Sequence, residues 1–171
     1  VLLMLPAMRQ LSLDRINSVS PYKVWATAQD NEYNFITRSG VLYGVSFMEE
    51  MKIADVQSYQ FSFARLNAIH SQFDDAIHQT LMAIICEFFN ANNDILIYIC
   101  DTSAGKETSR SRLFIKWFDE YEEKSRFIIK TASTYIENQG FYTAMIVERT
   151  NKHLAAIIDD FDNTANLLCD K

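Results

Sequence analysis

The segment from Ile95 to Phe118 constrains the fold of this chain more than any other. It begins with an apolar run typical of a buried strand, continues with a short polar turn, and ends in an amphipathic helix that carries Phe114 and Trp117 on one face. In an α/β sheet, ligands usually lie at such a strand end, where the turn and the first helical N–H groups converge. The segment therefore indicates where a ligand would bind, but it identifies no reaction.

The length and composition favour one domain. The chain has 171 residues, of which 49% are hydrophobic and 13% aromatic, enough for one sizeable core and short for two. We expect residues 1–19 to form an N-terminal extension with a short helix, and residues 20–171 to form a single α/β domain. The apolar opening Val1–Pro6 is too short to span a bilayer, so no membrane segment is expected.

The charge and the cysteines narrow the class of protein. A net charge of −6 with scattered cations disfavours nucleic-acid binding, because the phosphate backbone would be repelled. The three cysteines lie far apart without C-x-x-C spacing, which is typical of reduced thiols in a cytoplasmic protein. Asp74, Asp75 and His78 have helical spacing, but acids in a first helical turn are better explained by the helix dipole, so no metal site is expected.

Hydrophobic periodicity predicts helices on both sides of a run of strands. The pattern predicts a sheet of about six to seven strands, single, mixed and largely antiparallel, flanked by helices, in the α+β (α/β) class. Glycine in Arg38–Gly40 is expected to supply the positive φ of a hairpin turn. The expected elements are a helix over 9–17, strands over 22–27, 33–37, 41–47 and 58–65, a helix with a capping box at Ser71-x-x-Asp74, a strand over 95–100, a helix through Phe114 and Phe118, strands over 127–132 and 141–147 joined through 138–140, and a last helix capped by Thr150.

This order of elements resembles the fold of the GCN5-related N-acetyltransferases, in which an antiparallel meander is followed by a helix, a strand, a helix and a closing hairpin. In those enzymes an Arg/Gln-x-x-Gly-x-Gly/Ala signature offers bare backbone N–H groups to the pyrophosphate of acetyl-CoA. The matching segment His70–Leu81 contains no glycine, and Asp74 and Asp75 place negative charge there. The resemblance therefore implies the fold, but acetyl-CoA is disfavoured and no cofactor is predicted.

A second resemblance rests on motifs spread along most of the chain, roughly Ser20 to Phe161. They are similar to a family of small uncharacterised proteins of Bacteroidetes-type bacteria, for which no activity is established. This resemblance implies a bacterial protein with one intact domain. The matching motifs are Tyr33-x-Phe35-x-Thr37, Gly40-x-x-Tyr43-x-Val45-x-Phe47, Asp75-x-x-x-x-Thr80-Leu81, Ile97-Tyr98-Ile99-Cys100-Asp101-x-Ser103 and Arg110-x-Arg112-Leu113-Phe114-x-x-Trp117-Phe118.

Polar residues around the strand end are the candidate ligand-binding site. Arg110 shares a helical stripe with Phe114 and Trp117, so its guanidinium is expected to point inward and bind a small anion together with Lys106 and the turn amides. The alternative is an internal Asp101–Arg110 ion pair that fastens the turn to its helix. No residue is assigned a catalytic role. The candidate set is Asp101, Ser103, Gly105, Lys106, Arg110 and Arg112.

Two classes of function stay open at this point. The first is a non-catalytic or catalytically degenerate acetyltransferase-like module that binds a protein partner or forms a homodimer. The second is an acyl-CoA-dependent N-acyltransferase with an atypical cofactor loop. The missing glycines favour the first, because an enzyme of this type gains its affinity for the coenzyme from those amides.

Overall fold

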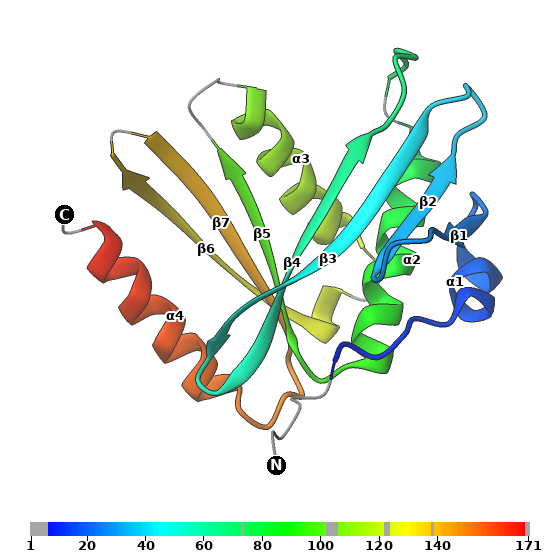
Figure 1. Cartoon of the computed structure of the whole chain (residues 1–171). Helices are drawn as coiled ribbons and strands as arrows, with labels where there is room; N and C mark the ends of the chain where they lie inside the picture. Colours follow the sequence, from blue (N-terminus) through cyan, green and yellow to red (C-terminus); the bar gives the residue numbers. More distant parts are fainter. Residues whose placement is uncertain (1–6, 73, 102–105, 122–123, 138, 170–171) are drawn as a thin grey trace. The chain divides into compact units, whose positions relative to one another are not determined.

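The computed structural model describes residues 7–169 except 73, 102–105, 122–123 and 138, and side chains are described for these residues except 100–101, 106–112, 124, 134–136, 139 and 166–169 (Figure 1). The elements are α1 Leu13–Val19, β1 Val24–Ala26, β2 Glu32–Ile36, β3 Leu42–Ile53, β4 Val56–Arg65, α2 Asp75–Ala91, β5 Ile95–Asp101, α3 Lys106–Glu120, the 3₁₀ turn η1 Lys124–Arg126, β6 Phe127–Ile136, β7 Gln139–Glu148 and α4 Leu154–Cys169.

The described strands form one mixed sheet in the order β1-β2-β3-β4-β5-β7-β6. β4 and β5 run parallel, with Ser58–Gln60 paired to Ile95–Ile97, and the chain between them contains α2. The pairs β1–β2, β2–β3, β5–β7 and β6–β7 are antiparallel. The predicted α+β class with a largely antiparallel sheet of six to seven strands is confirmed.

The chain divides into two compact units. The first contains Val1–Ser46 and Phe63–Asn93, and the second contains Phe47–Ser62 and Asp94–Lys171. β3 and β4 each contribute residues to both units. The predicted boundary after residue 19 stays a prediction.

The two helices of the first unit begin where an acceptor side chain caps them. Ser12 Oγ accepts the Arg15 N–H at 3.2 Å, so α1 begins at Leu13. The predicted helix over 9–17 therefore begins and ends too early in the sequence. Asp74 accepts the Ile77 N–H, so α2 begins at Asp75. The prediction that Ser71 caps this helix is wrong, because Asp74 is already a capping residue and lies nearer the apolar stripe.

Aromatic residues of the strands form part of the core of the first unit. Phe35 stacks on Tyr43, with ring centroids 5.3 Å apart. Tyr43 and Val45 of β3, and Val41 directly before it, belong to the predicted buried face and are all buried. The turn before this strand has Gly40 at φ 82, and the Gly40 N–H donates to the Thr37 carbonyl at 2.9 Å. The predicted positive φ of this glycine is confirmed.

In the second unit, α3 and α4 cover opposite faces of the strands (Figure 1). Phe114 of α3 stacks on Tyr98 of β5 at a centroid distance of 4.2 Å. On the other face, Phe161 of α4 joins a buried cluster that includes Ile95 and Ile97. Successive side chains of a strand point to opposite faces, so the apolar run of β5 supplies a core on both.

The turn that joins β3 to β4 adopts an unusual backbone conformation. Ala54 has φ 49 and Asp55 has φ 63, and a two-residue hairpin turn requires positive φ at both central positions. Neither residue is glycine, so the turn is strained by about 1–2 kcal/mol at each position. The Ala54 N–H donates to Asp160 Oδ2 of α4 at 2.6 Å, which holds the strained turn in place.

Two predictions near the end of the chain are wrong. The turn between β6 and β7 was expected at 138–140, but Gln139 and Gly140 lie in β7 and pair with Ile136 and Tyr135. Glu137, at φ 51, begins the turn instead. α4 begins at Leu154, so Thr150 does not cap it.

We expect Ala54→Gly to raise the free energy of unfolding by about 1 kcal/mol, because glycine adopts positive φ without a Cβ clash. Urea denaturation of the wild type and the variant measures this change. Ala156→Gly, the same substitution on the exposed side of α4, is the matched control and should lower the free energy by about 1 kcal/mol. A loss of stability in both variants would show that the turn is not strained.

Candidate functional site

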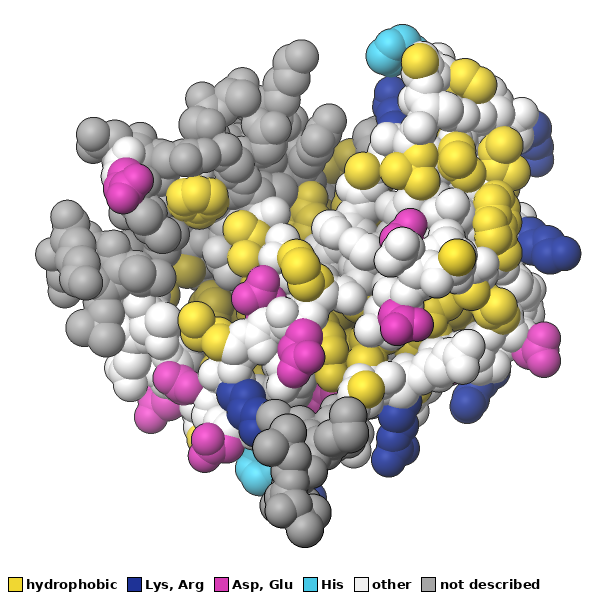
Figure 2. Space-filling model, in the orientation of Figure 1, with side chains coloured by type: hydrophobic (Ala, Val, Ile, Leu, Met, Phe, Trp, Pro, Cys, Tyr) yellow, Lys and Arg dark blue, Asp and Glu magenta, His cyan; other side chains and the backbone are white. Residues whose placement is uncertain are grey.

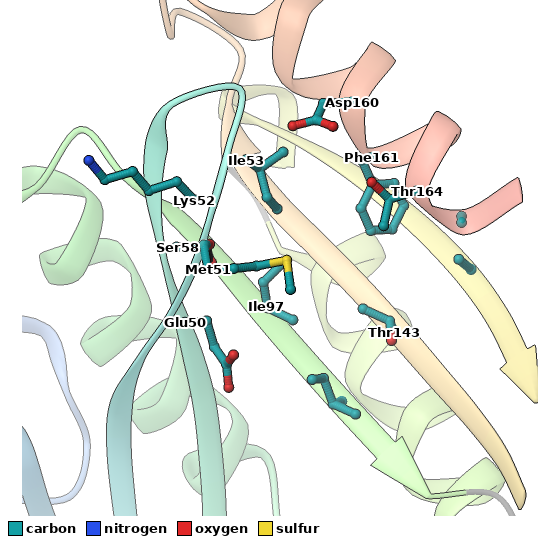
Figure 3. Close-up of a pocket in the computed structure, with 13 residues that line it drawn as sticks. Glu50, Met51, Lys52, Ile53, Ser58, Ile97, Thr143, Asp160, Phe161 and Thr164 are labelled. Carbon is teal, nitrogen blue, oxygen red and sulfur yellow. Dashed lines mark hydrogen bonds between the residues drawn. The ribbon is translucent and has the colours of Figure 1, made fainter. Parts of the chain in front are cut away.

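A pocket of about 340 Å³ opens in the second unit on the side of the sheet that α4 covers (Figure 3). We call it the α4 pocket. Its floor contains Ile97 and Ile99 of β5, and its walls come from Met51 of β3 and Phe161 of α4. The volume lies in the lower part of the range of about 300–1,000 Å³ that is typical of small-molecule sites. The arrangement is therefore suited to a small ligand with an apolar body.

The local sequence explains how these side chains come together. Ile95, Ile97 and Ile99 alternate along β5 and point to the α4 side, and Ile157 and Phe161 lie one helical turn apart on α4. The turn at Ala54 places the end of β3 beside α4, because Asp160 holds its backbone N–H.

Polar groups lie at the edges of the α4 pocket. Asp160 and Glu50 each bring a carboxylate, and Thr143 and Thr164 bring hydroxyl groups. Within the described residues, the Glu50 carboxylate makes no hydrogen bond or ion pair, and it is half-buried. The side chain of Lys52 points away from the pocket (Figure 3). The described charges that face the pocket are therefore negative.

The polar side chains that line the α4 pocket include hydroxyls and carboxylates. Ser58 donates its hydroxyl hydrogen to the Met51 carbonyl, which leaves it a structural role. Among the described residues, no group of three or more His, Cys, Asp or Glu side chains could hold a metal ion. The pocket offers apolar surface, two carboxylates and two threonine hydroxyls to a bound molecule.

The N-terminus of α2 is closed by an acidic side chain from its own chain. Asp74 Oδ1 accepts the Ile77 N–H at 2.8 Å, and Asp74 Oδ2 accepts the Tyr22 hydroxyl hydrogen at 2.7 Å. Burial, followed by the hydrogen bond to Asp74, raises the pKa of Tyr22 above its ordinary value of 10.0. A ligand anion at this helix end would meet the negative charges of Asp74 and Asp75 in place of free N–H groups.

The side chains of the predicted strand-end site lie outside the described residues. Asp101 is the last residue of β5, and its backbone is in register with Phe141 of β7. Ser103 and Gly105 lie outside the described backbone as well. Lys106, Arg110 and Arg112 belong to α3, of which only the backbone is described at these positions. The anion site and the Asp101–Arg110 pair both stay predictions.

Sequence reasoning missed the α4 pocket. Glu50 and Met51 lie in a segment for which no strand was predicted, and Thr143 and Asp160 carried no motif. The last helix and the strand over 95–100 were predicted, and the apolar spacing of Ile157 and Phe161 in this helix was an available signal for a covered face of the sheet.

Comparisons with known proteins identify a family of unknown function. A family model described as a family of unknown function (DUF6169) matches residues 73–163. No match was found among curated proteins or among solved structures. None of the helices in the described part of the chain is long and apolar enough to cross a bilayer.

We expect the free energy of unfolding to fall as the pH rises above about 10, because tyrosines with a raised pKa in the fold lose their protons more readily when unfolded. Tyr22, Tyr33 and Tyr59 are such residues, and burial is the largest cause for each. In Tyr22→Phe one of these groups is absent. The loss of stability between about pH 8 and about pH 11, measured by urea denaturation, should be smaller than in the wild type. An identical loss would show that Tyr22 titrates normally.

Proposed function

Because the chain belongs to the DUF6169 family, whose function is unknown, we propose from its geometry that it is a non-catalytic or catalytically degenerate binding module with an acetyltransferase-like order of elements. The order of strands and helices supports this proposal. The meander β1 to β4 is followed by α2, a parallel β5, α3 and the closing hairpin of β6 and β7. The proposal places the protein among bacterial proteins of the cytoplasm, where the thiol of Cys86, a residue that forms no disulfide within the described part of the chain, would stay reduced.

The observation that carries the proposal is the hydrogen bonding of Asp74. A coenzyme diphosphate would need the free N–H groups of a helix N-terminus, and here Asp74 already accepts the Ile77 N–H. The Tyr22 hydroxyl holds the second carboxylate oxygen and fixes the acid in this position. A diphosphate that displaced the Asp74 carboxylate would leave the Tyr22 hydroxyl without this acceptor. It would also lie close to the negative charge of Asp75. Both consequences oppose binding of acetyl-CoA.

A binding module needs a surface or pocket for its partner. The α4 pocket supplies one for a small molecule, and exposed apolar side chains such as Met48 and Ile36 offer contact area for a protein partner or a second copy. The alternative function is an acyl-CoA-dependent N-acyltransferase with an atypical cofactor loop. It shares the fold and differs in one measurable property, which is affinity for the coenzyme.

We expect acetyl-CoA and free coenzyme A to bind no more tightly than about 1 mM, the upper end of ordinary enzyme KM values, when titrated into the full chain by calorimetry. Asp74→Asn is the informative variant, because asparagine retains the helix cap while it removes the charge. Affinity that appears only in this variant would identify the carboxylate as the obstacle. Micromolar binding to the wild type would favour the acyltransferase.

We also expect inorganic phosphate to stabilise the protein through the predicted strand-end site around Arg110. The melting temperature should rise by about 2–4 °C for each kcal/mol of binding free energy. Arg110→Ala should abolish most of this shift. Lys116→Ala is the matched control, since Lys116 is an exposed cation of the same helix that pairs with Glu120 at 3.6 Å. An equal rise in melting temperature on adding phosphate to both variants would contradict an anion site at Arg110.

A further inference from the structure

We propose that the α4 pocket binds a small apolar molecule that carries one positively charged amine. The inference rests on the proposed function, since it names the class of ligand that the binding module takes. Its two parts, an apolar body and a cation, are carried by different residues of the pocket.

The apolar body is inferred from hydrophobic side chains that the chain itself leaves uncovered. Ile99 on the central strand β5 is 37% exposed, and Met51 is 72% exposed, although both line the pocket. Ile97 and Phe161 are only 7% and 8% exposed, so the chain itself already covers most of these two side chains. A ligand that covers Ile99 and Met51 would remove apolar area from water, which stabilises the complex.

The positive charge is inferred from the carboxylates at the edge. Figure 3 shows Asp160 and Glu50 at opposite ends of the pocket, and the side chain of Lys52 points away from it. Asp160 already accepts the Ala54 N–H, whereas the Glu50 carboxylate makes no hydrogen bond or ion pair with the described residues, and only the Glu50 backbone carbonyl accepts one, from Gln57. A cationic amine near Glu50 would gain an ion pair, and a ligand carboxylate would be repelled.

The net charge of the chain has the same sign. On the face seen in Figure 2, acidic side chains lie among exposed hydrophobic ones, in keeping with the net charge of −6. The hydroxyls of Thr143 and Thr164 give the pocket further hydrogen-bond acceptors, because each hydroxyl oxygen offers lone pairs. An aliphatic or aromatic amine therefore fits the charge and the lining better than a fatty acid does.

The test uses three ligands with one apolar chain and different head groups, namely octylamine, octanol and octanoate. Calorimetric titration of the full chain should give the tightest binding for octylamine, weaker binding for octanol and the weakest for octanoate. The dissociation constants of octylamine and octanoate should differ about tenfold. This is the difference expected when one half-exposed ion pair is gained and one repulsion is avoided.

Two neighbouring variants assign the charge effect. Glu50→Gln should weaken octylamine binding by about three- to fivefold and leave octanol binding unchanged. Glu49→Gln removes the same charge one residue earlier in β3, outside the lining of the pocket, and should change octylamine binding less than twofold. Equal effects of the two variants would overturn the assignment to Glu50.

A pocket-filling variant separates the pocket from unspecific adsorption. Ala165→Phe places a ring in the pocket and should abolish binding of all three ligands, while an unchanged far-ultraviolet spectrum shows that the protein is folded. Binding that survives this variant, or equal affinity for octanoate and octylamine, would overturn the proposal.

A dimer in light scattering that Met51→Lys dissociates would also overturn the proposal, because a second copy would then cover the pocket. None of these measurements involves the coenzyme. A negative result here would therefore contradict the ligand proposal without contradicting the proposed function.

Discussion

The hydrogen bond from the Ala54 N–H to Asp160 is the interaction on which the geometry of the second unit depends. Ala54 and Asp55 both have positive φ without being glycine, so the turn between β3 and β4 is strained and needs an external partner. Asp160 supplies that partner from α4, which is itself anchored by Phe161 in the apolar cluster with Ile97. The Asp160 carboxylate thus joins the strained turn to the packed helix α4, and this contact positions one wall of the α4 pocket.

Acidic side chains also organise the first unit, but there they accept hydrogen bonds from backbone N–H groups. Glu87 of α2 is only 2% exposed, and it accepts the Ser12 N–H at 3.1 Å and lies 3.6 Å from Arg15. Asp74 closes the other end of the same helix with the help of Tyr22. Buried carboxylates are stable only when such donors surround them. The carboxylates near the two ends of α2 therefore bind α1 and the segment around Tyr22, respectively.

The sequence predicted the elements whose pattern is local. Alternating apolar residues located the strands, and Gly40 located a turn, because glycine is the residue that a positive φ favours. The turn at Ala54 had no such residue, so the extensions of β3 and β4 were missed. The α4 pocket was missed for a different reason, since Glu50, Thr143 and Asp160 are brought together by tertiary packing across more than a hundred residues. No spacing in the sequence reports such a contact.

The extent of the family match divides the α4 pocket into two parts with different roles. Residues 73–163 contain the floor at Ile97 and Ile99 and the wall at Phe161, which together supply the apolar surface. Glu50 and Met51 lie outside that segment, on the part of β3 that the strained turn positions. Apolar contact gives affinity with little discrimination, whereas a single charge at the edge decides between head groups. The selectivity of the proposed pocket therefore depends on Glu50 of the β3–β4 hairpin, whereas its apolar contacts come both from Met51 of this hairpin and from the matched segment.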